Sequence, residues 1–399
     1  MAAMSDLLTI NEALALVLDR IRRLPAEPVA IEDAAGRVTA EDVVAEVELP
    51  PFRSSAMDGF AVRAADTPGT LAIVDRVAAG RPSDRVLGPG EAMAISTGGV
   101  VPEGADTVVP IEIVAVSGNA VEISEPAEHG ASVRPVGGDV AAGAVVLPAG
   151  LRLTPARIGA LAAAGVASVS CARRPRAAVL STGTELRRPG EPLGPGQIYE
   201  SNSLMLAAAL AAAGAEVVRL EPVADDEDAH REALARGLEA DVLVSSGGVS
   251  VGPHDLVRAV GGELGIEEVF WRVAVKPGKP VAFGVRGDTL VFGLPGNPVS
   301  ALVGFELFVR PALRALAGET SPEPRFEPGT LAEALRRAPG RDQLVRARIE
   351  PSQDGVLLRP LRGQDSHMIV RAAAADALVH VPRGEGELAA GSAVRYLAI

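Results

Sequence analysis

The chain has 399 residues, a formal net charge of −13 at pH 7, and 48% hydrophobic against 22% charged residues. This length predicts about two to four globular domains, and the acidic balance argues against nonspecific nucleic-acid binding, which needs a basic face. The single cysteine, Cys171, excludes an intrachain disulfide and a cysteine-only metal cluster, and its small apolar surroundings predict a buried thiol rather than a nucleophile.

The N-terminal part has no basic-then-apolar leader, and no apolar run reaches membrane-spanning length, so we expect a soluble cytoplasmic protein without membrane contact. Thr9 and Glu12 form a capping-box pattern before a helical repeat over residues 10–23. Short β-branched runs then predict a small β-rich domain, the clearest being residues 71–77, 107–116 and 120–124. A second helical repeat follows at residues 155–165. We expect these two helices to pack together as one discontinuous linker domain.

Strands and helices alternate regularly after Pro175. The pattern predicts strands at 177–180, 216–220, 241–244, 269–275 and 289–292, and helices at 201–213, 226–238, 254–260 and 299–316. Such alternation is typical of a mainly parallel sheet covered by helices on both faces. Beyond Pro322 short strands return at 343–349, 355–360 and 377–381, which predicts a small C-terminal β domain.

These patterns predict an α/β multidomain chain with four parts. We expect a linker domain from 1–40 and 141–173, a β-rich domain over 41–140, an α/β domain over 174–322 and a C-terminal domain over 323–399. In open α/β sheets, ligands collect at the carboxyl ends of the strands. The loops that follow the strands are therefore where chemistry is expected.

Every unusual loop of the α/β domain falls at that edge of the sheet. These loops carry hydroxyls, carboxylates, lysines and backbone donors. They are residues 181–186, Asp225 with Asp226, residues 245–252 with Asp255 just beyond, Lys276 with Lys279, and residues 295–298. Their common position predicts one ligand site.

The loop over residues 245–252 combines hydroxyls with backbone N–H groups at a helix start, which suits phosphate or another oxyanion. No Lys-Ser/Thr pair follows, so it is not a Walker A loop, and no Gly-x-Gly-x-x-Gly fingerprint follows a strand, which disfavours dinucleotides. A tight strand-to-helix turn without a ligand is the alternative.

Lys276 and Lys279 lie in a Pro/Gly frame after an apolar run, which favours a rigid loop and a preorganised anion site. A solvated surface pair, the usual fate of lysine, is the alternative. Asn297 and Pro298 match an N-cap and a first helical residue. The helix that they open is expected to direct its positive dipole end toward the lysines.

Four carboxylates at this edge, Glu185, Asp225, Asp226 and Asp255, offer oxygen ligands to a hard cation. Mg²⁺ usually takes one or two carboxylates, together with substrate phosphates and water. One of Asp225 and Asp226 can instead cap the following helix. His230, on that helix, is expected in solvent.

The β-rich domain contributes three further loops. Residues 53–61 place small polar residues before Asp58, for which an Asx-turn is the simplest explanation. Residues 97–99 and 134–139 form comparable loops. None of the three identifies a ligand by itself.

Taken together, these segments resemble the molybdopterin molybdenumtransferases, the family of MoeA and the gephyrin E domain. The resemblance covers nearly the whole chain and is most specific at residues 54–61, 181–186, 245–252, 276–280 and 293–300. It implies a linker domain, a β-rich domain, a central three-layer α/β domain that binds molybdopterin, and a C-terminal β-barrel. It also implies an elongated homodimer, in which Asp58 and Thr97 of one subunit complete the cleft of the other.

The activity that the resemblance implies is Mg²⁺-dependent insertion of molybdate into adenylylated molybdopterin, with release of AMP and possible handover of the cofactor to molybdoenzymes. The residues implied to act in catalysis are Asp58, Thr97, Glu185, Asp225, Asp255, Lys276 and Lys279. Those implied to bind the pterin or molybdate are Arg134, Ser181, Thr182, Gly183, Ser246, Gly247, Gly248, Ser250, Gly252, Pro280, Pro295, Gly296, Asn297, Pro298, Ser300, Arg346 and Ser366. Those implied to ligate Mg²⁺ are Glu185, Asp225, Asp255, Asp58 and Asp139.

The sequence departs from the family pattern in two loops. Thr184 stands where the family often has Asp, which leaves Glu185 as the only carboxylate of its loop. Asp365 stands where a glycine is usual, beside Ser366. A carboxylate there repels molybdate unless it points away or holds a cation.

The implied chemistry suits the residues. Lys276, Lys279 and Arg346 can hold molybdate and phosphate anions, and bound Mg²⁺ would neutralise the pyrophosphate as AMP leaves. No nucleophilic residue is needed, because the pterin supplies the sulfurs that bond the metal.

Two alternative functions stay open. The adenylyltransferase of the preceding step shares the α/β domain but lacks both β domains, and a non-catalytic pterin-binding scaffold would tolerate loss of Asp58 or Glu185.

Overall fold

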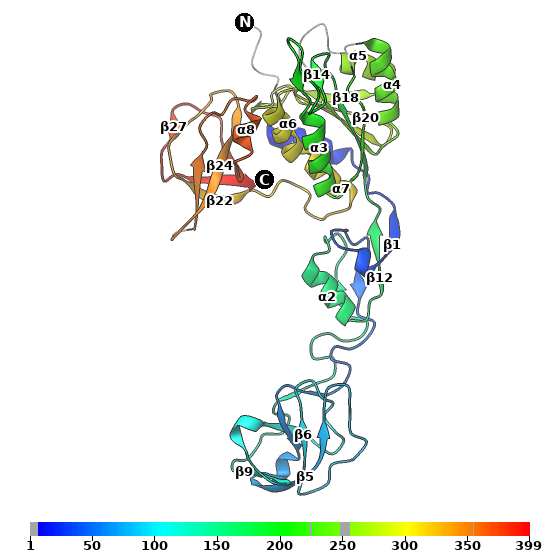
Figure 1. Cartoon of the computed structure of the whole chain (residues 1–399), viewed down its shortest axis with the longest axis vertical. Helices are drawn as coiled ribbons and strands as arrows, with labels where there is room; N and C mark the ends of the chain where they lie inside the picture. Colours follow the sequence, from blue (N-terminus) through cyan, green and yellow to red (C-terminus); the bar gives the residue numbers. More distant parts are fainter. Residues whose placement is uncertain (1–6, 224–225, 248–255, 354) are drawn as a thin grey trace.

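A computed structural model describes residues 7–223, 226–247, 256–353 and 355–399. The molecule is elongated, with the α/β domain and the barrel together at one end and the β-rich domain alone at the other (Figure 1). The linker domain lies between them and contains β1 (Ala26–Ala30), β12 (Ser168–Ala172) and α2 (Pro155–Ala163). The predicted α/β multidomain architecture is confirmed.

The α/β domain is built on a six-stranded sheet in the order β16-β13-β17-β21-β20-β18. Its strands are β13 (Arg176–Ser181), β16 (Glu216–Arg219), β17 (Val242–Ser246), β18 (Glu267–Trp271), β20 (Ala282–Arg286) and β21 (Thr289–Leu294). The first four in spatial order run parallel, and β20 is antiparallel to both of its neighbours. The sheet is therefore mainly parallel, as predicted. Strand β20 was not predicted, because a tight turn at Gly287 replaces the helix expected between successive strands.

Helices cover both faces of this sheet. One face carries α1 (Ile10–Asp19), α3 (Asn202–Ala212) and the continuous segment of α6 (Pro298–Gly304), η4 (Phe305–Val309) and α7 (Arg310–Leu316). The other face carries α4 (Glu227–Gly237) and α5 (Leu256–Glu263). Ala177 and Val179 enter the first core, whereas Ala178 and Leu180 enter the second, because side chains alternate along a strand.

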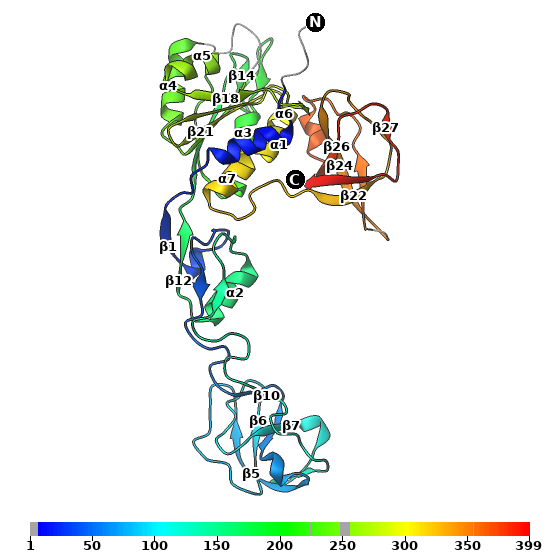
Figure 2. The same ribbon diagram turned by 180° about the vertical axis from the view of Figure 1, so that it is seen from behind.

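The N-terminal helix packs against a different partner from the one predicted. Helix α1 has the expected capping box, but Leu14 and Val17 are buried with Phe308 of the α/β domain (Figure 2). The expected packing of α1 on α2 is therefore wrong, since the apolar stripe of α1 meets the larger apolar surface of η4 and α7. Segments on both sides of the β-rich insert still share a separate core, which contains Leu161 and Cys171.

The β-rich domain contains a six-stranded sheet in the order β7-β4-β6-β5-β9-β8. Its strands are β4 (Gly59–Val62), β5 (Gly69–Val77), β6 (Glu91–Ile95), β7 (Thr107–Pro110), β8 (Ala115–Ser117) and β9 (Ala120–Ile123). Two short antiparallel pairs lie outside this sheet. They are β3 (Ser54–Ser55) with β10 (Val133–Arg134), and β2 (Val43–Val44) with β11 (Val145–Leu147).

The C-terminal domain is a closed five-stranded barrel, as predicted. Its strands are β22 (Glu327–Leu331), β24 (Asp342–Ser352), β25 (Gly355–Pro360), β26 (Ala377–Val381) and β28 (Ala393–Ala398). The barrel closes because β24 pairs with both β25 and β26. Strand β19 (Val275–Lys276) adds to β24, and this pairing joins the α/β domain to the barrel.

The remaining elements are short. They are β14 (Leu186–Arg187), β15 (Ile198–Tyr199), β23 (Leu335–Arg336), β27 (Glu387–Leu388), α8 (Ile369–Ala372), η1 (Ile31–Asp33), η2 (Ala64–Asp66) and η3 (Ile111–Ile113). In the described part of the chain, no helix has both the length and the apolar composition that crossing a membrane requires.

Candidate active site

Three loops meet at the carboxyl edge of the central sheet. Strands β13, β17 and β21 are parallel neighbours, so their carboxyl ends lie side by side. The backbone N–H of Thr182 donates to the carbonyl of Ser246 at 3.1 Å, and that of Gly247 donates to the carbonyl of Leu294 at 3.1 Å. The Ser246 hydroxyl donates to the carbonyl of Pro295 at 3.2 Å. The three loops therefore form one hydrogen-bonded unit.

Glycine is required where these loops approach most closely. Gly247 has a φ of 95°, and a Cβ added there would lie 2.8 Å from both the carbonyl and the hydroxyl oxygen of Thr182. A Cβ added to Gly183 would collide with the carboxylate of Glu185, which folds back against the backbone. Gly296 is under no such constraint, because a Cβ added there would lie 3.8 Å from the Cα of Gly247, an ordinary contact distance. The backbone of these three loops is thus closely packed at the carboxyl edge of the sheet. We call this surface the floor.

A cleft of about 280 Å³, partly open to solvent, lies over this floor. Its volume is close to the lower end of the range of small-molecule sites. The cleft brings together seven of the predicted site residues: Ser181, Thr182, Glu185, Ser246, Gly296, Asn297 and Pro298. Its other lining residues were missed: Leu186, Ile198, Tyr199, Glu200, Ser201 and Asn202 of the α/β domain, and His367 and Ile369 of the barrel domain.

Glu200 organises one wall of the cleft. Glu200 is only 5% exposed. The carboxylate accepts hydrogen bonds from the Ser181 hydroxyl at 2.9 Å and from the backbone N–H and hydroxyl of Ser203 at 2.7 and 2.6 Å. A buried carboxylate that accepts three hydrogen bonds is satisfied in its polar contacts and fixes its partners. Glu200 therefore positions Ser181 at the end of β13.

Asn202 ties helix α3 to two of the loops. Its amide nitrogen donates to the Ser246 hydroxyl at 2.8 Å and to the Gly296 carbonyl at 2.7 Å. The sequence did contain a signal for this wall, because the polar run 200–203 directly precedes an Ala/Leu helix. Such a run is also typical of an ordinary helix start, so it did not stand out.

The five carboxylates implied to bind Mg²⁺ are not gathered in one chain. Asp225 and Asp255 lie outside the described residues, as do Gly248, Ser250 and Gly252. Glu185 lines the cleft, whereas Asp58 and Asp139 belong to the β-rich domain. The described residues contain no group of three potential ligand side chains. Glu185 alone still offers the oxygen donor that Mg²⁺ uses beside a phosphate-bearing substrate.

Asp226 takes the capping role that was the alternative to metal binding. Its carboxylate accepts a hydrogen bond from the backbone N–H of Ala229 at 2.8 Å, at the start of α4. His230 is 1% exposed rather than in solvent. The Nδ1 atom of His230 lies 2.8 Å from the carbonyl oxygen of Asp226, so this buried ring has a hydrogen-bond partner.

The loop with Lys276 and Lys279 bridges the α/β domain and the barrel. The backbone N–H of Val273 donates to the carbonyl of Lys279 at 3.0 Å and closes the base of the loop. A Cβ added to Gly278 would lie 3.4 Å from the carbonyl oxygen of Ser300, so the loop packs on α6. Pro298, at the start of the same helix, lines the cleft. The lysine loop therefore adjoins the cleft at the amino end of α6.

Lys276 and Lys279 are the only lysines in the chain. All the other residues among the 38 Lys and Arg are arginines. Lys276 is exposed and Lys279 is partly buried, and neither forms an ion pair with any residue that the structure describes. A compact ammonium group differs from a planar guanidinium in shape and hydration. The chain thus uses lysine only at two positions three residues apart in one loop.

Arg346 shapes a loop of the barrel domain. Its side chain is 1% exposed and donates to the carbonyls of Gly363, Asp365 and Met368 at 2.9, 3.2 and 3.1 Å. Burial lowers the pKa of Arg346, while the Asp365 charge opposes this change. The guanidinium thus holds the loop over residues 363–368, and Arg346 is not among the residues that line the cleft.

Ser366 docks that loop on the α/β domain. Its carbonyl accepts a hydrogen bond from the backbone N–H of Val299 at 3.1 Å, in the first turn of α6. The next residue, His367, lines the cleft. Asp365, which departs from the family pattern, is exposed. The loop thus reaches the amino end of the helix on which the lysine loop also packs.

Asp58, Thr97 and Arg134 gather at one end of the β-rich domain. One carboxylate oxygen of Asp58 accepts hydrogen bonds from the backbone N–H and the hydroxyl of Thr97, at 2.7 and 3.0 Å. The backbone bond, and then the hydroxyl bond, hold the pKa of Asp58 below its ordinary value. Arg134 pairs in register with Ser54 of β3. Asp139 is exposed farther along, and its N–H donates to the Leu49 carbonyl at 2.8 Å.

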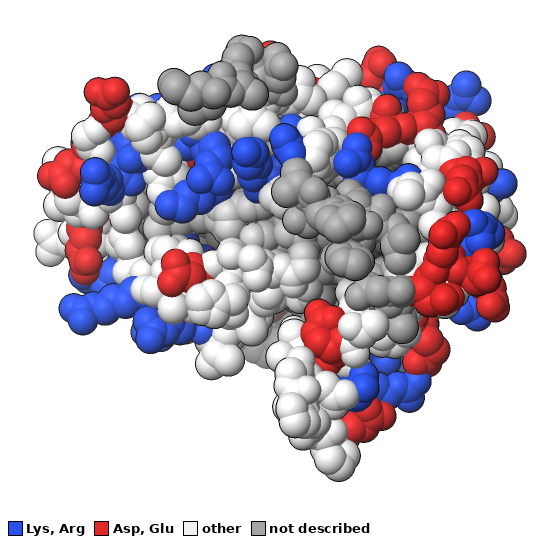
Figure 3. Space-filling model, turned by 90° about the horizontal axis from the view of Figure 1, so that it is seen from above, with Lys and Arg blue, Asp and Glu red and all other residues white. Residues whose placement is uncertain are grey.

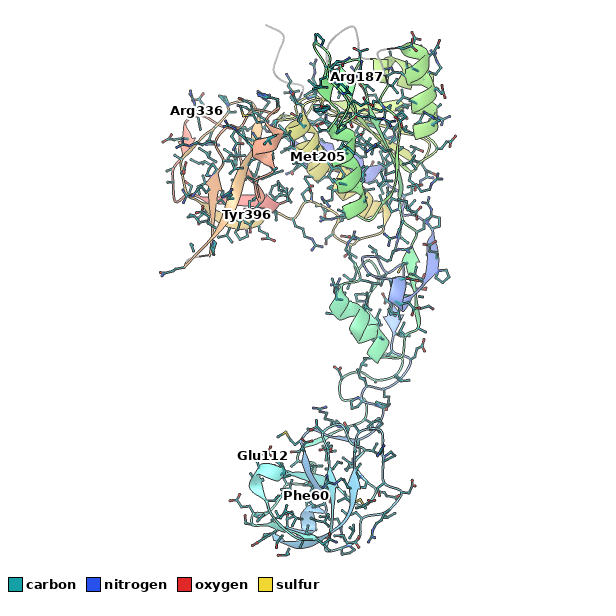
Figure 4. All side chains as sticks on the ribbon, viewed as in Figure 1. Phe60, Glu112, Arg187, Met205, Arg336 and Tyr396 are labelled. Atoms are coloured by element: carbon teal, nitrogen blue, oxygen red, sulfur yellow. The ribbon has the colours of Figure 1, made fainter. Side chains whose placement is uncertain are left out.

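Within one chain, the predicted site residues of the β-rich domain lie far from the cleft. They are Asp58, Thr97, Arg134 and Asp139. Figure 4 shows Phe60 and Glu112 in the remote β-rich domain, far from Arg187 and Met205 of the α/β domain. The linker domain keeps them apart, and an ion pair of 2.7 Å between Arg152 and Glu319 fixes its junction with the α/β domain. One copy of the chain therefore brings together only the α/β and barrel parts of the predicted site.

Charge is unevenly distributed over the end of the molecule that holds the cleft. Seen from above, basic side chains form a row from the barrel side toward the centre (Figure 3). Acidic side chains gather over the opposite side of the α/β domain. Although the net charge is −13, this end therefore has a basic zone that can attract anions.

Known protein families match three consecutive parts of the chain. Residues 8–165 match the MoeA N-terminal region (domain I and II), and residues 328–399 match the MoeA C-terminal region (domain IV). Residues 178–315, which form the sheet and the cleft floor, match a probable molybdopterin binding domain. The three matches together span most of the chain.

Similar proteins match it over their full length. A molybdopterin molybdenumtransferase 2 of Mycobacterium tuberculosis is 40% identical, over 96% of this chain and 98% of the relative. A molybdopterin molybdenumtransferase of Haemophilus influenzae is 34% identical, over 97% and 98%. The solved molybdopterin biosynthesis moeA protein of Pyrococcus horikoshii OT3 has a TM-score of 0.85 and 29% identity, covering 99% of this chain and 100% of that one. The chain belongs to the MoeA family of molybdopterin molybdenumtransferases.

Proposed function

We propose that this chain inserts molybdate into adenylylated molybdopterin and releases AMP, in the last step of molybdenum cofactor synthesis. Its family makes it a transferase of molybdenum cofactor biosynthesis. The more specific proposal rests on one observation. The only two lysines of the chain lie in one loop, which adjoins the cleft of the molybdopterin-binding domain.

In this proposal the cleft binds the pterin substrate. Its floor offers backbone groups and the Thr182 hydroxyl to polar atoms of the pterin and its phosphates. The Ser181 and Ser246 hydroxyls already donate to Glu200 and Pro295, so they offer acceptor oxygens to donor groups of the pterin. Glu200 holds the Ser181 hydroxyl, and Asn202 holds the Ser246 hydroxyl, before the ligand arrives. Preorganised groups lose little freedom on binding, which favours affinity.

Lys276 and Lys279 supply charge for the second substrate. Molybdate is a compact dianion, and two ammonium groups on a stiff loop bind it as point charges. The loop 363–368, braced by Arg346 and docked on Val299, adds Ser366 on the barrel side of the same helix end. The lysines thereby hold molybdate close to the pterin dithiol, whose two sulfurs replace one molybdate oxygen, and this oxygen leaves as water with the two thiol protons.

Mg²⁺ is the cofactor of this proposal, and when bound it neutralises charge on the pyrophosphate that loses AMP. Glu185 would hold it from the cleft wall, with substrate phosphates and water as further ligands. Asp58 has one carboxylate oxygen that does not bond Thr97, so it is suited to the same role from another subunit. In this proposal, Asp225, Asp255 and Asp139 are further ligands of Mg²⁺.

A homodimer completes the site in this proposal. The β-rich domain carries Asp58, Thr97 and Arg134 on the far side of the linker domain, away from the cleft that the described α/β and barrel residues form. The β-rich domain of a second copy would present the same residues to this cleft. Each subunit is then incomplete alone. Handover of the cofactor to molybdoenzymes and a cytoplasmic location belong to the same proposal.

No protein nucleophile takes part. Cys171 is fully buried in the linker domain, and burial raises the pKa of its thiol. A thiol that stays protonated is a poor nucleophile and metal ligand. The chain acts by positioning two anions and neutralising their charge.

A purified assay with adenylylated molybdopterin, molybdate and Mg²⁺ tests the proposal. We expect AMP release that depends on molybdate, together with a product that activates an apo-molybdoenzyme. Adenylylation of free molybdopterin with ATP would instead support the adenylyltransferase. Pterin binding without AMP release, unchanged in Glu185→Ala, would support a scaffold.

A further inference from the structure

His367 brings an imidazole to the cleft from the barrel domain. It is one of two barrel residues that line the cleft, and it is exposed. Its side chain forms no hydrogen bond and no ion pair with any residue in the described ranges. The described protein therefore leaves both ring nitrogens available to a ligand.

No other described histidine reaches this site. The chain has five histidines, and of the four that the structure describes only His367 lines the cleft. The other three lie elsewhere in the molecule: His129, His230 and His380. His254 lies outside the described residues. Imidazole is the side-chain group that most readily both accepts and donates a proton near neutral pH, so its place in the cleft has chemical consequences.

The other titratable side chains that line the cleft already have partners or a proposed task. Glu200 accepts three hydrogen bonds. The Tyr199 hydroxyl donates to a backbone carbonyl at 3.0 Å. Glu185 is the proposed ligand of Mg²⁺. Among the described residues of the cleft wall, His367 is therefore the proton carrier that remains free to act on a substrate.

The loop that carries His367 and the lysine loop meet the same end of α6. The backbone N–H of Val299 donates to the carbonyl of Ser366, the residue before His367, at 3.1 Å. The next residue of the helix is Ser300, whose carbonyl oxygen lies 3.4 Å from a Cβ added to Gly278 of the lysine loop. The imidazole thus belongs to the end of the cleft where α6 begins and where the lysine loop packs.

The proposed reaction requires a group that moves protons. As the two pterin sulfurs bond molybdenum, two S–H bonds break, and one bond between molybdenum and oxygen breaks to release water. Molybdenum keeps its oxidation state, so no electron donor or acceptor is needed. Both protons pass from the thiols to the leaving oxygen, and a positioned side chain accelerates such a transfer.

We propose that His367 carries these protons, first as a general base and then as a general acid. This inference rests on the function proposed above and adds a catalytic residue to it. The neutral imidazole accepts the proton of one thiol as its sulfur bonds molybdenum, and then donates this proton to the leaving oxygen. A second cycle transfers the proton of the other thiol. The oxygen leaves as water, and the imidazole is neutral again.

The test measures a single turnover of the full-length protein with adenylylated molybdopterin, molybdate and Mg²⁺. The cofactor that forms is measured by activation of an apo-molybdoenzyme. His367→Gln keeps a polar side chain but removes the proton carrier, whereas His367→Ala leaves room for imidazole added to the solution. His129→Ala is the matched control, because it removes an exposed imidazole from the β-rich domain. Lys279→Ala tests whether added imidazole acts specifically.

We expect the rate of cofactor formation to fall about 100-fold in both His367 variants, as for loss of general acid–base catalysis. The melting temperature and the molybdate concentration that gives half the maximal rate should stay the same. Added imidazole should restore most of the rate to His367→Ala, but not to His367→Gln, where the side chain fills the space, nor to Lys279→Ala. His129→Ala should keep its full rate.

Three outcomes would overturn the inference. Full rates in both His367 variants of an active protein would do so and would leave the proposed function standing. A loss that imidazole does not restore in His367→Ala, or that it restores equally in Lys279→Ala, would show that the residue only supports the loop. If the unmodified protein forms no cofactor at all, the proposed function fails and this inference falls with it.

Discussion

The backbone N–H of Val299 donates to the carbonyl oxygen of Ser366 at 3.1 Å, which fastens a loop of the barrel to the first turn of α6. The same helix also carries the packing contact with the lysine loop, through Ser300. Two domains are therefore held in register around the amino end of one helix. The α/β and barrel parts of the site depend on this junction.

Replacing Arg346 tests how that loop is held. Arg346→Met leaves three loop carbonyls without their donor, and we expect the free energy of unfolding to fall by about 3 kcal/mol. Denaturant unfolding measures this change. Arg348→Met, at an exposed position of the same strand, is the control and should be nearly neutral. Equal stability of the two variants would show that Arg346 is not a brace.

Exchanging the lysines for arginine tests whether the ammonium group matters. We expect Lys276→Arg and Lys279→Arg each to raise the KM for molybdate about tenfold, because a guanidinium of different shape and reach replaces a point charge on a stiff loop. Arg286→Lys, the reverse exchange outside the loop, should leave KM unchanged. Unaltered KM in both loop variants would mean that charge alone suffices there.

The contact between Asp58 and Thr97 predicts a pH dependence. Because the pKa of Asp58 is lowered from 3.8 in the folded protein, the carboxylate stabilises the fold above that pH, and the contribution is lost as the pH falls through the lower folded pKa. Thr97→Val removes the hydroxyl bond but keeps the backbone bond. An NMR titration should then place the Asp58 pKa between its native value and 3.8. A further decrease would contradict the assignment.

The buried thiol predicts chemical inertness. Cys171 lies in the linker core with a raised pKa, so alkylating reagents should leave the native protein unmodified and fully active at pH 8. Labelling after unfolding in denaturant is the positive control. Rapid native labelling with loss of activity would reopen a role for this cysteine.

Much of the fold could be predicted, because alternating apolar runs and helical repeats report local structure directly. The sheet, its carboxyl-edge loops and a small C-terminal β domain followed from such patterns, whereas its closure into a barrel was implied by the family resemblance. The partner of α1 did not, since an apolar stripe shows that a helix is buried but not against which surface. Strand β20 was missed because a hairpin replaced the expected crossover helix.

The site was predictable where glycine, proline and hydroxyl residues mark a loop, as at Ser181, Ser246 and Pro298. It was not predictable where a polar side chain turns inward. Arg346 and Glu200 carry charges that usually face solvent, yet their burial depends on partners contributed by distant segments. A single sequence does not show such partners.

Subunit complementation tests the central claim, that two incomplete copies form one site, most directly. The Asp58→Ala chain and the Lys279→Ala chain should each be inactive alone, since each lacks one half of every site. After the two are unfolded together and refolded as a mixture, random pairing should restore about a quarter of the sites, seen as molybdate-dependent AMP release. A mixture that stays inactive, although both chains fold and pair, would contradict a site shared between copies.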